Sequence, residues 1–538
     1  MSYKMAGVKE MKKPTIFLLA VLTVSPLGCS GPQATVSASQ EKQKGISYAC
    51  WWPGLYSLPD SDISLAHLTE TGANWISLIV TCYQDNLGST RIFAGESTPT
   101  DDDLIHALGQ AHALGLKVML KPHLDLSSDP SHWRGEIGQA YTTETEWTAW
   151  FASYRTFIEH YANLAAAHGA DQFCVGCELE GTTHREADWR AVVAGIRSRF
   201  AGPLIYAGNH SGEEVGMTWW DAVDLIGVDA YYPLSTKTNP SLDELKAAWQ
   251  PLVASLASLA ARWHKPLVLT EIGYRSIDGT AMHPWDWQIQ GKVDLQEQAD
   301  CYRAAFESLY RQPWFGGIYW WSWSPDSLEG GPNDDGYSPH DKPAEDVLRR
   351  WFGGLRRRAP HRTPEPNPDR RIEILAEGLG EGWEDRSWGA ERDFEASDES
   401  HQGGRSLRAR LDPWGAVSVW HPTFASYSYY YLEFHVRGSG GNEPQLWAYF
   451  YDRDGNPLLR TPVNDPRYID GGKIEAGRWK RVSIPLADMG AARTLLSRFS
   501  LQDRSGHGTT TFWVDDLRII GAKWRGERPR PTKRPTVR

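Results

Sequence analysis

Cysteine is scarce in this chain of 538 residues, and the motifs that usually hold a metal or a nucleotide are missing. Cys174 and Cys177 form a lone C-x-x-C, but no second pair and no histidine couple follows at zinc spacing, so we expect no metal site there. No glycine-rich phosphate turn follows the first predicted strand, which argues against a dinucleotide-binding fold. Apart from Cys29 the cysteines are odd in number, so at least one stays free, and whether Cys50 and Cys82 pair is left open.

Basic and long apolar stretches are also few. The net charge is −11 at pH 7, and the basic clusters are confined to residues 356–358 and the C-terminal tail, outside both predicted domains. That distribution argues against nucleic acid as a partner. Apart from one short N-terminal run, no stretch is apolar enough to cross a membrane.

The N-terminus has the pattern of a secretion signal. Two lysines precede an apolar run at residues 16–24, which is too short to span a bilayer. Cys29 stands where a bacterial lipoprotein is cleaved and acylated, although Pro26 occupies a position usually held by leucine. We expect residues 1–29 to be a lipoprotein-type signal peptide and residues 30–44 a flexible tether. The protein would then be exported, as a cell-envelope lipoprotein or an extracellular protein, and would touch the membrane only through a lipid anchor at Cys29.

Aromatic side chains, by contrast, are abundant, with 26 Trp and 22 Tyr. Core packing accounts for most of them. Sugars nevertheless present flat C–H faces that stack on such rings, so the excess favours a carbohydrate site.

Residues 45–352 predict an α/β fold, a (β/α)8 TIM barrel. Amphipathic helical segments separate eight short apolar runs, as buried parallel strands require. The fifth and eighth helices have the weakest pattern. A doubly wound open sheet is the alternative, which the missing phosphate turn disfavours. The eight runs are residues 46–50, 75–80, 117–120, 172–176, 204–207, 225–228, 267–270 and 316–320.

The remainder of the chain changes in character. Residues 353–370 are rich in Pro and Arg and predict a semi-rigid linker. Residues 371–522 contain alternating, β-branched and aromatic segments separated by glycine-rich turns, which predicts a separate all-β sandwich of the jelly-roll kind. Residues 523–538 are expected to be a basic disordered tail.

Two glutamates end apolar runs of the barrel. Glu178 follows the fourth run and Glu271 ends the seventh, so both are expected at the carboxyl ends of strands, where βα barrels build their active sites. Two carboxyls on one rim are the requirement of a glycoside hydrolase, and a retaining enzyme holds them about 5–5.5 Å apart. One of them must stay protonated near neutral pH, which burial and the charge of its neighbour can achieve.

Seven segments of the barrel, taken in chain order, carry a resemblance to a known family: GISYACWWPG, LKVMLKPHLDL, WRGEI, FCVGCELEGT, GVDAYYPL, LVLTEIGYRS and GGIYWWSWSPD. Together they resemble glycoside hydrolase family 113, a family of TIM-barrel retaining glycosidases known chiefly for β-1,4-mannanases, and the resemblance covers roughly residues 45–350. The resemblance implies that Glu178 is the general acid/base and Glu271 the nucleophile. Cys177 departs from the related families, in which asparagine usually precedes the acid/base and contacts the sugar 2-hydroxyl.

Glu180 competes with Glu178 for the acid role. It lies two residues further on, and on an extended strand end it would share a face with Glu178. Glu186 and Glu213 have the pattern of solvated loop or helix acids.

Other residues near strand ends are candidates for binding the sugar. His123 and Asp125 follow the third strand, Asn209 follows the fifth, and Trp133 lies on a rim segment. The resemblance implies that Tyr231, with Tyr232 as the alternative, hydrogen-bonds the nucleophile, and that Trp321 forms a platform under the sugar. Trp320 and Trp323 are expected in packing, whereas Trp51 and Trp52 are equally compatible with subsites and with structure. The predicted substrate-binding set is His123, Asp125, Asn209, Tyr231, Trp321 and Trp133.

The expected function is retaining hydrolysis of a β-1,4-linked glycan, with endo-β-1,4-mannanase first and a β-glucanase, xylanase or chitosanase as alternatives. A glycan-binding surface protein without catalysis is a third possibility. The double displacement needs no metal and no organic cofactor. The partner is a polysaccharide or oligosaccharide, and a monomer is expected.

Two segments of the C-terminal sandwich, EGWEDRSWGA at residues 381–390 and TFWVDDLRII at residues 511–520, resemble carbohydrate-binding modules in outline. Candidate sugar platforms there are Trp383, Trp388, Trp414, Trp447 and Tyr449, although sandwich cores use the same residues. Asp515 and Asp516, with Glu377, are similar to a structural calcium site seen in such sandwiches.

Overall fold

The computed structural model describes residues 41–327, 329–354, 365–426, 429–492 and 494–523. The chain divides into two compact units, one up to Arg357 and one from Arg358. Cys29, the predicted signal peptide, the predicted tether up to residue 40 and the tail beyond Lys523 lie outside the described residues. Among the helices of the described ranges, none is long and apolar enough to cross a membrane.

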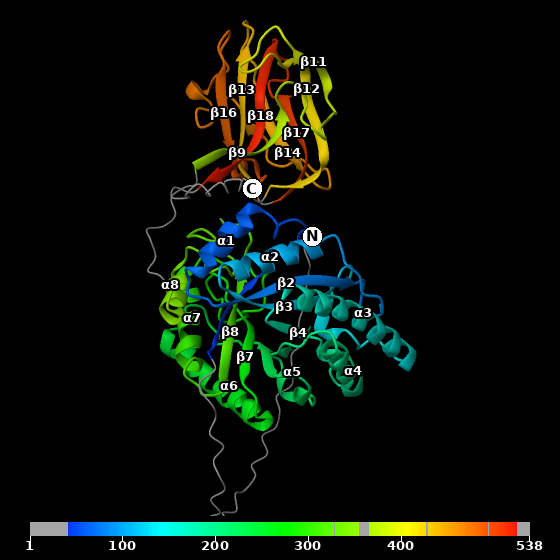
Figure 1. Ribbon diagram of the computed structural model, residues 1–538. Helices are drawn as coiled ribbons and strands as arrows, with labels where there is room; N and C mark the ends of the chain where they lie inside the picture. Colours follow the sequence, from blue (N-terminus) through cyan, green and yellow to red (C-terminus); the bar gives the residue numbers. More distant parts are fainter. Residues whose placement is uncertain (1–40, 328, 355–364, 427–428, 493, 524–538) are drawn as a thin grey trace, which may run out of the picture. The chain divides into compact units, whose positions relative to one another are not determined.

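Eight parallel strands close into a barrel in sequence order, which confirms the predicted α/β barrel (Figure 1). Each predicted run overlaps one strand, because strands buried on both faces are continuously apolar. The strand β1 begins at Gln43, so the last two residues of the predicted tether belong to the barrel. The strands are β1 (Gln43–Tyr48), β2 (Trp75–Gln84), β3 (Lys117–Leu126), β4 (Gln172–Cys177), β5 (Leu204–Asn209), β6 (Leu225–Asp229), β7 (Leu267–Ile272) and β8 (Phe315–Trp323).

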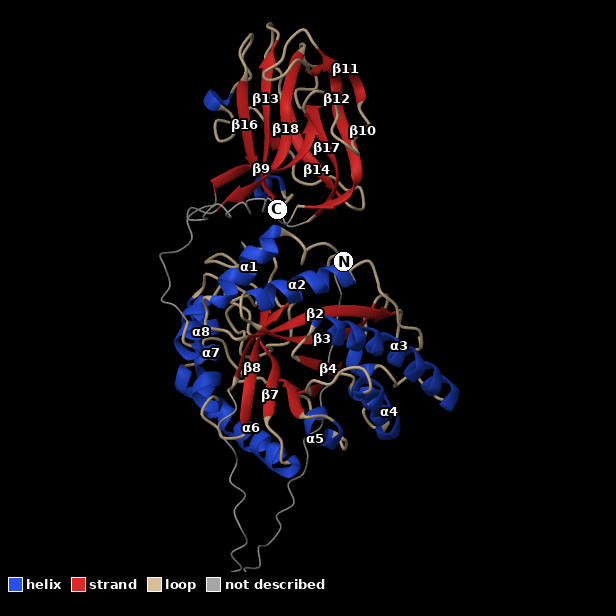
Figure 2. Ribbon diagram, viewed as in Figure 1, coloured by secondary structure: helices blue, strands red, loops and turns tan. Residues whose placement is uncertain are grey.

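Helices surround the ring of strands (Figure 2). Three of the longest helices begin with capping boxes, in which a Thr or Ser side chain and an acid three residues later satisfy each other's backbone N–H groups. The fifth helix, weak in sequence, is a single turn. The helices are α1 (Pro59–Thr69), α2 (Asp101–Ala113), α3 (Glu144–His168), α4 (Glu186–Arg197), α5 (Glu213–Gly216), α6 (Leu242–Trp263), α7 (Leu295–Leu309) and α8 (Pro343–Phe352).

The barrel interior is filled in layers. At the amino ends of the strands, Gln43 donates to Gln172 at 2.7 Å and accepts from the Tyr319 hydroxyl at 2.9 Å. Above this layer lies an apolar cluster that includes both Cys174 and Cys177. The pairing of β4 with β5 shifts register between these two cysteines, which lets both thiols join the interior. The carboxylates lie above them, at the carboxyl ends.

The second unit is an antiparallel all-β domain, as predicted. The twenty-residue strand β12 pairs with β18 through its first half and with β17 through its second half, and it thereby connects both sides of one core. The strands of this all-β domain are β9 (Glu365–Leu375), β10 (Glu384–Asp385), β11 (Trp388–Ala396), β12 (Ser406–Ala425), β13 (Tyr429–Gly438), β14 (Leu446–Asp452), β15 (Thr461–Pro462), β16 (Lys480–Pro485), β17 (Leu495–Asp503) and β18 (Phe512–Lys523).

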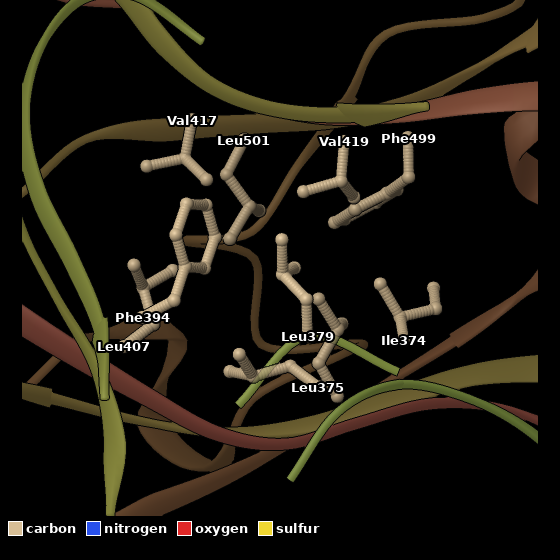
Figure 3. Close-up of a pocket in the computed structure, with 10 residues that line it drawn as sticks. Ile374, Leu375, Leu379, Phe394, Leu407, Val417, Val419, Phe499 and Leu501 are labelled. Atoms are coloured by element: carbon tan, nitrogen blue, oxygen red, sulfur yellow. The ribbon is translucent and has the colours of Figure 1, made fainter. Parts of the chain in front are cut away.

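Part of the predicted linker is strand. Residues 365–370 extend β9, because they pair with the last residues of β18, while residues 355–364 lie outside the described part. The core of this domain holds a small void of about 10 Å³, lined by ten apolar side chains that include Leu379, Phe394 and Phe499 (Figure 3). A void without polar partners does not hold water, and one of this size is a small gap in the packing of the core and not a ligand site.

The described cysteines carry no disulfide. Cys50 and Cys82, whose pairing the sequence left open, are free: the Cys50 thiol contacts the Trp52 carbonyl, and the Cys82 thiol contacts the Tyr161 hydroxyl.

Candidate active site

The two glutamates share one mouth of the barrel. Glu271 belongs to β7, and Glu178 directly follows β4. Each glutamate has a carboxylate oxygen within 4.8 Å of the Cys177 sulfur, so these two carboxylate oxygens are separated by less than twice that distance. One sugar ring can therefore contact both carboxyls.

Glu271 is held by hydrogen bonds at both oxygens. Its Oε1 accepts from Lys121 Nζ at 2.5 Å, and its Oε2 accepts from the Tyr231 hydroxyl at 2.8 Å. His123 Nε2 lies 3.4 Å from Oε1. The carboxylate is 5% exposed and fixed in orientation, as a nucleophile must be.

Glu178 lies in a different environment. Its Oε1 accepts from Asn209 Nδ2 at 2.9 Å, and Arg134 Nη1 lies 3.7 Å from its Oε2. The residue has a φ of 51°, in the left-handed region that is unfavourable for a side chain with a Cβ. The backbone N–H of Glu178 donates to Ala207 at 2.8 Å, which holds this strained turn in place.

A buried ion pair lies beneath Glu271. Lys121 is fully buried and lies 3.1 Å from both carboxylate oxygens of Asp229. Asp229 also accepts from the Thr270 hydroxyl at 2.7 Å and from the Cys177 thiol at 3.2 Å. Every oxygen of this pair is satisfied, which a buried charge requires.

The two glutamates differ in their proton affinity. Burial, followed by the charge of Asp229, raises the pKa of Glu178 to about 8, so this carboxyl is protonated at neutral pH. Burial and Asp229 also raise the pKa of Glu271, but Lys121 opposes them through its charge and its hydrogen bond. Glu178 is thus arranged to donate a proton and Glu271 to carry charge.

Arg134 and His123 link the two carboxylates. Arg134 Nη1 donates to His123 Nδ1 at 3.1 Å, and Nη2 donates to Asp125 at 3.2 Å. Burial, with Lys121 and Arg134 nearby, holds the pKa of His123 well below its usual range. A neutral ring that accepts at Nδ1 carries its proton on Nε2, which faces Glu271.

Comparison with known proteins agrees with this geometry. The profile of Glycoside Hydrolase Family 113 matches residues 49–342, more than half of the chain. The chain belongs to glycoside hydrolase family 113.

Two solved structures illustrate what this family 113 hydrolase is similar to. One is a GH113 β-mannanase from Alicyclobacillus acidocaldarius in complex with ManMIm, with 34% identity and a TM-score of 0.53 over 58% of this chain and 98% of that one. The other is a complex of a GH113 β-1,4-mannanase, with 28% identity and a TM-score of 0.53 over 59% of this chain and 100% of that one. No curated protein matches the chain.

The aromatic residues of the hydrolase divide between the site and the core. The Trp321 ring stacks on His123 at a centroid distance of 6.2 Å and meets the exposed Trp51 edge-on at 6.0 Å. The Trp133 ring lies against Gly135 of its own turn, and the neighbouring Arg134 is the residue that reaches the carboxylates of Glu178 and Asp125. Trp320 and Trp323 are buried in packing.

The competing residues lie elsewhere. Glu180 is exposed and accepts from the Ser211 hydroxyl at 2.9 Å. The Tyr232 hydroxyl donates to Glu214 at 3.1 Å and not to Glu271. Glu213, expected to be solvated, is 4% exposed: it accepts from Tyr206 and from the Asn209 backbone, and the expectation was wrong.

Sequence reasoning missed Lys121, Asp229 and Arg134. A signal existed for the first two. Lys121 is two residues before His123 on one strand, so both point into the barrel, and Asp229 ends the sixth strand as Glu271 approaches the end of the seventh. Arg134 lies on a loop, and loops have no hydrophobic periodicity from which their shape could be predicted.

Proposed function

We propose that this hydrolase is a retaining endo-β-1,4-mannanase. The observation that carries the proposal is the pair of carboxyls at one mouth of the barrel, one protonated and one charged. Membership of family 113, and the solved β-mannanases that cover this barrel, favour mannan over other β-glycans.

The proposed reaction is a double displacement. The Glu271 carboxylate attacks the anomeric carbon, while Glu178 gives its proton to the departing glycosidic oxygen. Glu178, now charged, takes a proton from water, whose oxygen attacks the same carbon and releases Glu271. Two inversions leave the anomeric configuration unchanged.

The proposed sugar contacts follow from the positions around these carboxyls. Trp321 and Trp51 offer a flat and an edge-on aromatic surface for the C–H faces of the sugar. Arg134, Asn209 and Asp125 offer donors and acceptors for hydroxyl groups. Cys177 stands where related families have an asparagine, and its thiol already donates a hydrogen bond to Asp229. We therefore expect Arg134, which lies beside this thiol, to supply the contact to the sugar 2-hydroxyl.

The test is product analysis on mannan, glucomannan, xylan, β-glucan and chitosan, with Glu178→Gln as the inactive control. Rapid release of mannooligosaccharides of mixed length is expected from mannan. NMR of the earliest product is expected to show the β-anomer, as retention requires. If the α-anomer appears first, the enzyme inverts the configuration and the proposed double displacement is wrong. Faster turnover of another polymer would favour an alternative substrate, and binding without any product would favour a non-catalytic protein.

We further propose that the C-terminal domain binds glycan through one sheet face. β14, β17 and β12 are neighbours in the sheet, and alternate residues of each pack into the core. The remaining residues form rows on the opposite face, which is aromatic and polar and carries arginines stacked on Trp447, Tyr449 and Tyr451. The rows are Trp447–Gln502–Ala416, Tyr449–Ser500–Ser418 and Tyr451–Arg498–Trp420.

The middle row and Gln502 are buried, but the rings of Trp447, Tyr451 and Trp420 are partly exposed, and such rings with guanidinium groups beside them suit a sugar chain. The full chain carrying Glu178→Gln should sediment with insoluble mannan. Adding Trp447→Ala and Tyr451→Ala should weaken this binding at least ~10-fold if each ring contributes ~1 kcal/mol. The control Leu114→Ala removes a side chain that is 40% exposed on the barrel and should change nothing. Equal binding by both variants would remove this face from consideration.

We propose, from the sequence, that the protein is exported and anchored through a lipid on Cys29, and that it is a monomer. Metabolic labelling with a fatty acid should mark the wild-type chain and not Cys29→Ala. Labelling of both would refute the anchor. Light scattering of the shortened chain that begins at Glu41 should give the mass of one copy.

A further inference from the structure

Two histidines and an aspartate converge in the all-β domain, and neither the catalytic site nor the proposed glycan-binding face uses them. His401 lies in the segment between β11 and β12, His435 on β13 and Asp516 on β18. His401 Nδ1 is 2.9 Å and His435 Nδ1 is 3.2 Å from the same oxygen, Oδ2 of Asp516. The two imidazole rings stack at a centroid distance of 3.6 Å and an interplanar angle of 13°.

The fold builds this cluster at an irregular point of the sheet. The pairing of β13 with β18 shifts register between Glu433 and His435, next to Asp516. Asp516 has a φ of 52°, which aspartate tolerates better than most residues. The neighbouring Asp515 accepts from the backbone N–H groups of His401 and Gln402, and so fixes the loop that carries His401.

A hydrogen-bond network alone leaves one group unsatisfied. His401 donates to Asp516, but the Nδ1 of His435 is buried and has no hydrogen-bond partner, although Asp516 is near. Buried ring nitrogens without a partner are rare and often mark an ion or a water. A cation between the three side chains would bind both nitrogens and the carboxylate.

The distances suit a transition metal. Bonds of ~2.0–2.2 Å that meet at right or tetrahedral angles place ligand atoms ~3.0–3.5 Å apart. The two nitrogens are 2.9 and 3.2 Å from the carboxylate oxygen, so a small shift admits the ion.

We propose that His401, His435 and Asp516 bind a divalent transition-metal ion, with Zn²⁺ as the ion of choice, and that it fastens the loop 397–405 to β13 and β18. Two imidazoles and one carboxylate suit zinc, whereas calcium prefers oxygen ligands. Two of the three oxygen ligands expected for calcium are engaged in other contacts: Glu377 accepts from the Gly404 backbone N–H, and Asp515 accepts from the backbone N–H groups of His401 and Gln402. Partial exposure of the three side chains leaves room for water as a further ligand.

The test is calorimetric titration of the metal-free full chain with Zn²⁺, alongside His435→Gln and Asp516→Asn. Asparagine keeps the backbone conformation of residue 516, so this second variant separates lost metal binding from misfolding. Each is expected to lose at least ~10-fold in affinity at this site, since even partners of a ligand contribute ~10–100-fold. The control His507→Gln removes an exposed histidine of the same domain and should bind like the wild type.

A second measurement separates this site from the active site, where His123, Cys177 and Glu271 also lie close together. Co²⁺ bound by two imidazoles and a carboxylate shows no thiolate charge-transfer band, whereas binding at Cys177 would produce one. The proposal is overturned if the wild type binds no Zn²⁺, if it binds only Ca²⁺, if the Co²⁺ spectrum shows only the thiolate-bound form, or if both variants bind as the wild type does. Hydrolysis and circular dichroism verify that each variant is folded.

Discussion

Replacing Lys121 with methionine should move the acid limb of the pH–activity profile to higher pH. Lys121 is buried and lies 2.5 Å from Glu271, where its charge favours the ionised carboxylate. Two unit charges at that distance interact by ~1.7 kcal/mol in bulk water and by ~7 kcal/mol at an effective dielectric constant of ~20. At 1.36 kcal/mol per unit, the smaller figure alone predicts a rise of about one unit in the pKa of Glu271.

The same substitution leaves Asp229 without its cation. Breaking a buried ion pair costs ~3–5 kcal/mol of unfolding free energy. The double variant Lys121→Met with Asp229→Asn removes the stranded charge as well. Because Asp229 raises the pKa of Glu271, the double variant should regain most of the stability and its acid limb should move back toward lower pH.

The assay is kcat/KM on a soluble mannooligosaccharide between pH 4 and 10, together with denaturant unfolding. Lys342→Met is the matched control, because Lys342 is equally buried and paired with Asp334 but contacts neither catalytic carboxyl. It should lower stability and leave both limbs in place. A folded Lys121→Met variant with the wild-type acid limb would show that Lys121 does not govern the charge of the nucleophile.

Three further predictions concern single residues. Glu178→Gln should lower kcat by ~10²–10⁴ because it removes the proton donor. The activity of the wild type should fall above pH about 8, where Glu178 loses its proton. Full activity of the variant would show that another residue is the general acid. Tyr231→Phe removes a hydrogen bond to a charged group that is worth ~1.5–3 kcal/mol, so kcat/KM should fall at least ~10-fold, whereas Tyr232→Phe should retain it; equal losses would indicate a packing effect. Burial raises the folded-state pKa of Glu213 well above its unfolded value, so the contribution of Glu213 to stability is greatest at low pH and declines as the pH rises from about 4.5 toward that folded pKa. Glu213→Gln removes this titration, and its Tm relative to wild type should rise with pH in thermal unfolding; a pH-independent difference would contradict the assignment.

The barrel could be predicted because its strands are buried on both faces and are therefore continuous apolar runs in the sequence. The rim could be predicted for a related reason: a polar residue that ends such a run must lie where the strand leaves the core. Glu178, Glu271 and Asn209 all obeyed this rule, and they meet at one mouth.

The residues that escaped prediction did so for physical reasons. Lys121 directly follows the predicted run 117–120, but a lysine is rarely buried without a charged partner. Its partner Asp229 is more than a hundred positions away in the sequence, and only the fold brings the two together. Arg134 lies on a loop, and only the fold brings it to Glu178. Glu213 looked solvated because a one-turn helix has no period that would show its buried side.

The bridge that Gln43 makes to Gln172 and Tyr319 decides where a shortened recombinant chain can begin. A product that starts at Glu41 retains the amide that ties the first strand to the fourth and the last. One that starts at Gly45 loses it, and two buried polar groups remain without a partner beside the seam between β1 and β8. Trimming those four extra residues should therefore loosen the closure of the cylinder at the end opposite the catalytic mouth.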